Sequence, residues 1–149
     1  MPDRYRSRQA QPTTAIHAAA IYCSDGRIGE HVDDFMTNAL DLPHYDRIAV
    51  PGGPAALVAR PDAALPPERM LGELRFLIEA HNLQRIVLIQ HDDCGFYHAR
   101  VKETDIEAVQ RRDVDELAAL LRKSTGIENI RGYFARFTDD GMVFERITP

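Results

Sequence analysis

Three side chains of different chemistry follow one apolar segment at alternate positions. In the stretch "IYCSDGRI", Cys23 ends the apolar run at 16–23, and Asp25 and Arg27 follow at alternate positions. Alternation is the period of an extended strand, so a strand through this stretch would turn the thiol, the carboxylate and the guanidinium to one side. That grouping suits a metal or catalytic site, but a buried cysteine beside an ordinary surface ion pair gives the same pattern. The stretch alone leaves both interpretations open.

A second polar stretch, "HDDCG", favours a metal site. His91 precedes Cys94 by three residues, a separation at which a loop or a first helical turn can direct both side chains to one atom. With Cys23 they make a set of two thiolates and one imidazole, which zinc (Zn2+) accepts, leaving a fourth position for water or a carboxylate. Asp25 is placed to be that ligand or to orient the water, with Arg27 holding the carboxylate. Two alternatives remain: a reversible Cys23–Cys94 disulfide, although no CxxC motif is present, and cysteines that only pack in the core.

These candidate residues follow predicted strands. Runs of β-forming apolar residues predict strands at 16–23, 46–50 and 85–90, and apolar residues at helical spacing predict helices at 28–40, 67–82 and 104–123. Two alternating runs, IRGYFARF and MVFERI, flank the turn TDDG and predict a closing hairpin. The expected fold is therefore α/β: a mainly parallel β-sheet flanked by helices, with a C-terminal antiparallel hairpin strand. Because ligands collect at the carboxyl ends of parallel strands, the two cysteine stretches are expected to converge.

Length and charge exclude several classes of function. The 149 residues suit one domain, 16–149, preceded by a flexible arm, 1–15, which lacks apolar periodicity. A formal charge of −5 without a basic stripe argues against nucleic-acid binding. No apolar run is long enough to span a membrane and no secretory signal is recognisable, so a cytoplasmic location is expected.

The two polar stretches carry a family resemblance. "CSDGR" followed by "HDDCG" resembles the C-x-D-x-R and H-x-x-C-G signatures of β-class carbonic anhydrases, and the similarity extends from about Ile16 to the closing strand pair. The resemblance implies that Cys23, His91 and Cys94 are zinc ligands and that Asp25 and Arg27 form the catalytic dyad. It also implies a closed form in which Asp25 itself ligates zinc, and assembly as a homodimer or a higher homo-oligomer.

The chain is a short and divergent example of that pattern. Gln90 stands where the family usually has glycine before the motif histidine, and "PGGP" at 51–54 replaces the usual Asn-Ala-Gly loop. Gly52 and Gly53 either shape the pocket floor or only turn the chain. Members of the family usually have an N-terminal helical arm that embraces the partner subunit, and most of the residues expected for that arm are not recognisable in this sequence. Since these changes lie near the expected pocket and the subunit contacts, the substrate and the oligomeric state are not determined by the zinc signature.

Three functions are consistent with these residues. The first is reversible hydration of carbon dioxide to bicarbonate by a zinc-bound hydroxide that Asp25 orients, with proton transfer to solvent through His98 or His31. The second is hydrolysis of a small sulfur analogue, carbonyl sulfide or carbon disulfide, at the same zinc. The third is a non-catalytic, zinc-stabilised binding domain in which Asp25 permanently closes the site. The expected partner in the first two is a small-molecule substrate.

Overall fold

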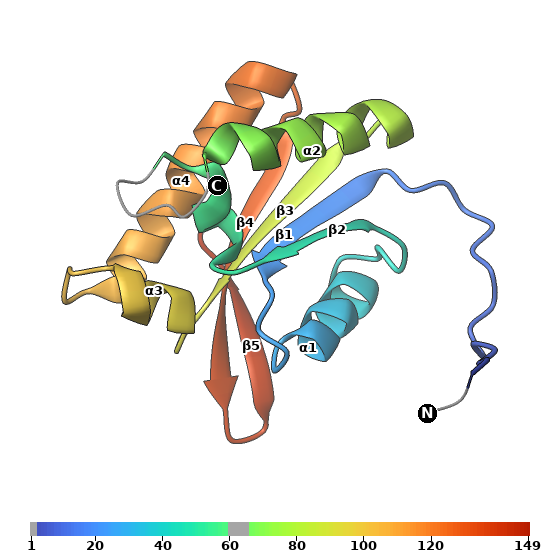
Figure 1. Ribbon diagram of the computed structural model, residues 1–149, viewed down its shortest axis with the longest axis horizontal. Coiled ribbons are helices and arrows are strands. Elements are labelled where there is room, and N and C mark those ends of the chain that lie inside the picture. Colours follow the sequence, from blue (N-terminus) through green and yellow to red (C-terminus); the bar gives the residue numbers. More distant parts are fainter. Residues whose placement is uncertain (1–2, 60–65) are drawn as a thin grey trace.

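Five strands form a single sheet in the order β2-β1-β3-β4-β5 (Figure 1). The computed structural model describes residues 3–59 and 66–149. The strands are β1 (Ala18–Cys23), β2 (Asp46–Val50), β3 (Arg85–His91), β4 (Asn129–Thr138) and β5 (Gly141–Arg146). The helices are α1 (Gly29–Asp34), α2 (Pro67–His81), α3 (Gly95–Arg100) and α4 (Ile106–Thr125), with a π-helical turn η1 (Phe35–Ala39) and a 3-10 segment η2 (Gly53–Leu57).

The sheet is parallel except at one edge. β1 is parallel to its neighbours β2 and β3, and β3 is parallel to β4. Only the β4–β5 pair is antiparallel, and this hairpin projects beyond the rest of the sheet in Figure 1. The predicted α/β fold with a C-terminal antiparallel strand is confirmed.

Alternate residues of the central strand β3 contact different layers of helices. Val87 and Ile89 belong to the buried cluster that includes α1, whereas Ile86 and Leu88 belong to the cluster that includes α2 and α4. All four side chains are buried, as expected for a parallel strand covered on both faces. β3 therefore emerges from the middle of the core, and its last residue is His91.

The helix predicted at 28–40 has two parts. α1 covers its first half, and in η1 the hydrogen bond from Leu40 N to Phe35 O spans five residues instead of four. This wider turn leaves Leu40 packed against the core. The helices predicted at 67–82 and 104–123 agree with α2 and α4 to within two residues at each end.

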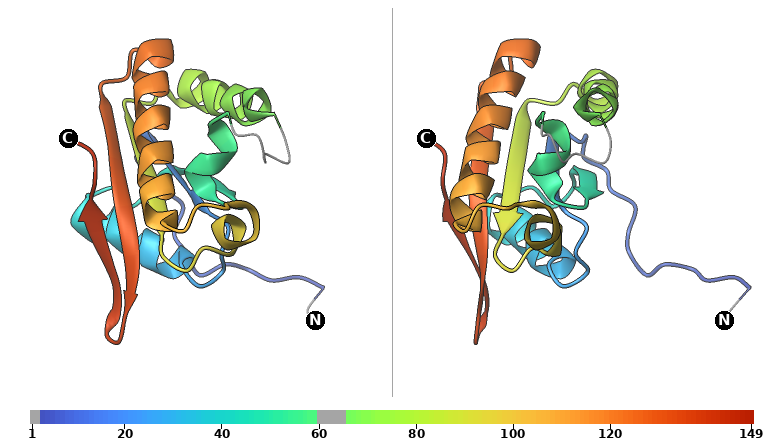
Figure 2. Two further views of the ribbon diagram at one scale, coloured as in Figure 1. Left: turned by 90° about the vertical axis from the view of Figure 1, so that its left-hand side faces the viewer. Right: turned by 60° about the vertical axis from the view of Figure 1, so that its left-hand side comes forward.

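Residues 3–17 contain no helix or strand, and they extend away from the sheet in both Figure 1 and Figure 2. β1 begins at Ala18, two residues later than predicted. The division into a flexible arm and one domain stays a prediction. Within the described ranges, no helix is both long and apolar enough to cross a membrane.

Candidate metal centre

Two neighbouring parallel strands deliver the candidate ligands to one edge of the sheet. Cys23 is the last residue of β1, His91 is the last residue of β3, and Cys94 stands in the turn just before α3. One possible ligand atom from each lies within 4.8 Å of the other two, and all three residues are buried. The structure thus brings together the three residues that the sequence predicted as a group.

The imidazole of His91 is oriented for a metal. Its Nδ1 lies 2.6 Å from the carbonyl oxygen of Asp92, which can only accept, so in the neutral imidazole Nδ1 carries the hydrogen and Nε2 keeps its lone pair. Nε2 is buried and has no hydrogen-bond partner within residues 3–59 and 66–149. A buried ring nitrogen without a partner is costly unless a ligand occupies its lone pair, so His91 fits the role of a metal ligand.

The two thiols are strongly coupled. Cys23 Sγ and Cys94 Sγ lie 3.9 Å apart, and both cysteines are free. A hydrogen bond from the Cys94 thiol lowers the pKa of Cys23, and the same bond, together with burial, raises the pKa of Cys94. Hydrogen bonding from the backbone of Tyr97 and Phe96 acts in the opposite direction and lowers the pKa of Cys94. Two sulfurs and one nitrogen in a buried setting are a donor set that suits Zn2+.

The predicted ion pair between Asp25 and Arg27 is present, but the reason given for it was wrong. The strand ends at Cys23, and residues 26–28 form a turn in which Ile28 N bonds to Asp25 O. An extended strand therefore does not align the side chains of Asp25 and Arg27. Instead, Asp25 Oδ1 accepts from the backbone N–H of Arg27 at 2.9 Å, and the turn folds the guanidinium back onto the carboxylate.

Arg27 links the first polar stretch to the second. Its Nη2 donates to Asp25 Oδ2 at 2.7 Å and its Nη1 donates to Asp93 Oδ2 at 2.9 Å. Hydrogen bonds from the Arg27 side chain and backbone lower the pKa of Asp25 to about 2, so this carboxyl is ionised at neutral pH. Both oxygens of Asp25 accept from Arg27, and Asp25 is not part of the group formed by the two cysteines and His91.

An open cavity of about 380 Å³ lies against these residues. It is lined by Cys23, Ser24, Asp25, Pro51, Gly95, Phe96, Ala99 and Arg100. The walls therefore come from the carboxyl ends of β1 and β2 and from α3, a short helix that the sequence did not predict. The cavity gives a small molecule access to Cys23 and to the carboxylate of Asp25.

The glycines of the "PGGP" loop are required by close packing. Gly52 and Gly53 have φ angles of 77° and 52°, in the left-handed region. A Cβ on Gly52 would lie 2.5 Å from the Phe96 ring, and one on Gly53 would lie 2.8 Å from the backbone nitrogen of Cys23. The loop therefore lies directly against β1 and against Phe96 of the cavity wall. Gly52 and Gly53 thus do more than turn the chain, because their lack of a side chain permits this packing beside the cavity.

Replacing Gly53 by alanine is expected to lower the free energy of unfolding by about 2–4 kcal/mol, because backbone strain and overlap with β1 add. Urea unfolding measures the change. Gly72 in α2 provides the matched control, since a Cβ there meets nothing within 4 Å. Gly72→Ala should raise stability by about 0.5–1 kcal/mol. Equal stability of Gly53→Ala and the native chain would contradict the packing described for this loop.

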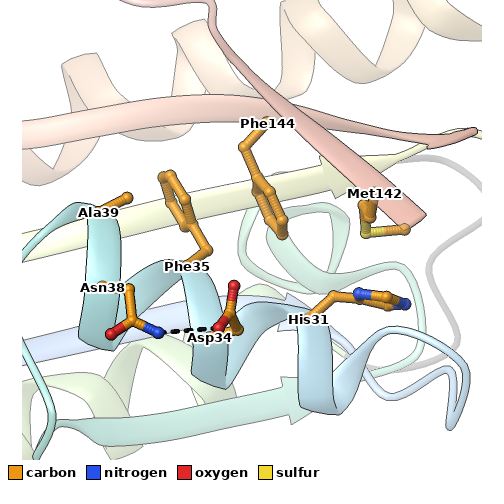
Figure 3. Close-up of a pocket in the computed structure, with 7 residues that line it drawn as sticks. All are labelled: His31, Asp34, Phe35, Asn38, Ala39, Met142 and Phe144. Carbon is orange, nitrogen blue, oxygen red and sulfur yellow. Dashed lines mark hydrogen bonds between the residues drawn. The ribbon is translucent and has the colours of Figure 1, made fainter. Parts of the chain in front are cut away.

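The two histidines considered for proton transfer lie in different places. His98 Nε2 is 3.7 Å from Asp93 Oδ1, and Asp93 contacts Arg27. His31 instead lines a separate cavity of about 380 Å³ between α1–η1 and β5, together with Phe35, Met142 and Phe144 (Figure 3). No ligand of the candidate metal centre lines that cavity. The structure thus relates His98, and not His31, to the Asp25–Arg27 pair.

Two buried polar residues near the centre were missed by the sequence analysis. Gln110 and Asp113 of α4 are 2% and 3% exposed, although they resemble ordinary polar residues of an amphipathic helix. The available signal was their spacing of three residues, which places them on one face of the helix with Val109 and Val114 nearby. Gln90 had been noticed as a departure from the family pattern.

The fold and the centre together define the class: an α/β protein with a candidate Cys–His–Cys metal site at the carboxyl edge of a mainly parallel sheet. A family model described as "Putative carbonic anhydrase" matches residues 13–135, and the chain belongs to this family. The β-class resemblance of the two signatures is thereby confirmed at the level of the family.

Known structures with the same fold are β-carbonic anhydrases. That of isoform I from Trichomonas vaginalis has a TM-score of 0.59 at 17% identity, covering 91% of this chain and 86% of its own. The carbonic anhydrase of Streptococcus mutans has a TM-score of 0.58 at 18% identity, covering 95% of this chain and 88% of its own. A tetrameric β-carbonic anhydrase from Sordaria macrospora has a TM-score of 0.55 at 14% identity, covering 87% and 80%. At these identities the likeness concerns the fold.

A curated relative is an uncharacterized protein of Rickettsia conorii, 24% identical over 107 residues. The match covers 72% of this chain and 56% of the relative, so the chain spans about half the length of the curated protein it matches.

Proposed function

We propose that this protein is a zinc-dependent carbonic anhydrase that hydrates carbon dioxide reversibly to bicarbonate. The observation that carries the proposal is the convergence of Cys23, His91 and Cys94 within 4.8 Å beside a cavity that also exposes Asp25. Family membership and fold support the same class of lyase. The three clustered residues would hold the metal, and Asp25 and Arg27 would form the catalytic dyad.

When bound, zinc supplies Lewis acidity that makes a nucleophile from water near neutral pH. The chain's own residues supply orientation. Asp25 is held ionised by Arg27, which donates to both of its oxygens, and its carboxylate would accept a hydrogen bond from the attacking water and orient it. Arg27 is in turn held by Asp93, so the dyad is anchored to the turn that carries Cys94. His98, next to Asp93, is the proposed route for the proton to solvent.

Hydrolysis of carbonyl sulfide or carbon disulfide is the second candidate. It is favoured by the apolar part of the cavity wall, where Pro51, Phe96 and Ala99 lie beside Cys23. A sulfur-containing linear molecule is larger and more polarisable than carbon dioxide, and such a wall would accommodate it. Side-by-side turnover on the two gases separates these candidates. A permanently closed, non-catalytic zinc domain is less favoured, because both oxygens of Asp25 bind Arg27.

The deciding experiment combines metal content with stopped-flow carbon dioxide hydration between pH 6 and 9. We expect about one zinc per chain and a rate that rises with pH through about 7, the region where zinc activates water. Zinc with no hydration at any pH but with turnover of carbonyl sulfide would replace the first candidate by the second. Absence of zinc from protein purified without chelators would contradict both.

Assembly and location are part of the same proposal. We propose a homodimer or a higher homo-oligomer acting in the cytoplasm on a small-molecule substrate, with the tetrameric Sordaria macrospora enzyme as the comparable assembly. Sedimentation at several protein concentrations tests the oligomeric state.

A further inference from the structure

Four buried polar side chains connect the candidate metal centre to α4. Gln90 and Tyr97 are 0% exposed, Gln110 is 2% exposed and Asp113 is 3% exposed. Burial of polar groups costs free energy unless their hydrogen bonds are made, so such a group inside an otherwise apolar core requires an explanation. The amide oxygen of Gln90 is buried and has no hydrogen-bond partner in the described part of the chain. Since an unpaired buried oxygen lowers the stability of the fold, stability alone does not account for these four polar side chains.

The first connection fixes the backbone of His91. Gln110 Nε2 donates to the carbonyl oxygen of His91 at 2.8 Å, and both residues are buried. This carbonyl group belongs to the last residue of β3, where the strand gives way to the turn that carries Cys94. The imidazole ring of His91 is held through Nδ1 by the carbonyl oxygen of Asp92, the next residue of the chain. The direction of Nε2 therefore depends on the position of the His91–Asp92 backbone.

The second connection fixes the backbone that serves Cys94. Gln90 Nε2 donates to Tyr97 Oη at 2.6 Å, and Tyr97 Oη donates to Asp113 Oδ2 at 2.6 Å. Tyr97 also lies in α3, three residues after Cys94, and hydrogen bonding from its backbone lowers the pKa of Cys94. A single residue thus anchors α3 to β3 and α4 through its hydroxyl group and acts on a metal-side sulfur through its backbone. Figures 1 and 2 show α3 beside the N-terminal end of α4.

We infer that Tyr97 and Gln110 are positioning residues of the metal centre: from outside the ligand set, they hold the Cys94 sulfur and the His91 nitrogen in a geometry that binds the metal. The inference rests on the metal-binding part of the proposed function. Residues that orient ligands from behind typically change metal affinity by about 10–100-fold when they are altered. Tyr97 and Gln110 stand outside the group of three candidate ligands and do not line the cavity beside it, so their effect should appear in the properties of the bound metal itself.

Cobalt(II) binding to the full chain tests the inference, because its absorption reports sulfur ligation and coordination geometry without any turnover. Tyr97→Phe removes only the hydroxyl group that bonds to Gln90 and Asp113, and Gln110→Met removes the donor to His91 at similar side-chain length. Each variant should bind cobalt about tenfold more weakly and shift the visible absorption bands. Tyr133→Phe is the matched control, since Tyr133 is buried in the same core cluster and is not one of the four residues of this hydrogen-bond network.

The outcomes separate the inference from the proposed function. If the native chain binds no cobalt through thiolates, the proposed metal site is wrong and the inference fails with it. If the native chain binds cobalt but hydrates no carbon dioxide, the proposed activity fails while the comparison of variants still stands. If Tyr97→Phe and Gln110→Met match the native affinity and spectrum, the two residues are structural only and the inference is overturned. Urea unfolding of each variant at the assay temperature establishes that the folded protein is compared.

Discussion

Asp25→Asn is expected to lower carbon dioxide hydration by about 10²–10³-fold while zinc remains near one per chain. Asparagine keeps the size of the side chain and an oxygen that Arg27 can contact, but it loses the negative charge that makes Asp25 a strong acceptor. The ligand set of two cysteines and one histidine is untouched, so the metal should stay. Stopped-flow hydration and metal analysis of the same preparation measure both quantities.

Asp34→Asn is the matched control for this change. Asp34 is an exposed residue at the end of α1, its side chain accepts a hydrogen bond from Asn38, and it lines the other cavity. Its replacement should leave the rate within about twofold of the native value, as expected for a surface change of small energetic effect. Native activity in Asp25→Asn would remove Asp25 from the mechanism.

The pKa of Asp25 also restricts the shape of the pH profile. Because Arg27 lowers this pKa to about 2, the folded state binds the proton more weakly than the unfolded state, whose carboxyl has its usual value near 3.8. The pair therefore stabilises the folded chain above about pH 4, and this contribution is lost as the pH falls toward 2. Between pH 6 and 9 the carboxylate stays ionised, so any change of rate in that range must come from another group.

Cys94→Ser is expected to abolish metal retention. Zinc bound to cysteine and histidine is worth about 10–16 kcal/mol in small domains, so loss of one of three protein ligands should weaken binding by roughly 10²–10⁴-fold. Dialysed protein would then contain close to no zinc, and hydration would disappear with the metal. Metal analysis after dialysis and a zinc titration against a chromophoric chelator give the change in affinity.

His44→Gln serves as the control for ligand removal. His44 is an exposed histidine in the segment before β2, away from the three clustered residues. Zinc near one per chain in His44→Gln and close to none in Cys94→Ser would confirm the ligand assignment. Retention of tightly bound zinc by Cys94→Ser would show that the metal binds elsewhere.

Local patterns were sufficient for most of the secondary structure. The strand at 46–50 was predicted with its observed bounds, and α2 differs by one residue, because apolar runs and helical spacing are properties of the chain itself. The helix α3 was missed, since "GFYHAR" is six residues long and has no periodicity to recognise. The π-helical turn η1 was missed as well, because the apolar spacing at 28–40 predicts a helix but does not distinguish the wider hydrogen bond from Leu40 N to Phe35 O.

What the sequence determined by itself was the set of chemical groups and the order of elements that carry them. Cys23, His91 and Cys94 could be named because thiols and imidazoles next to predicted strand ends are a recognisable ligand set. The tertiary structure decided how these groups meet: the turn that folds Arg27 onto Asp25, and the reach of α4 to His91 and Tyr97. Contacts such as Gln110 with His91 join residues far apart in the chain, and no local pattern encodes them. They exist only because packing of the helix on the sheet buries both partners, where each must find a hydrogen bond.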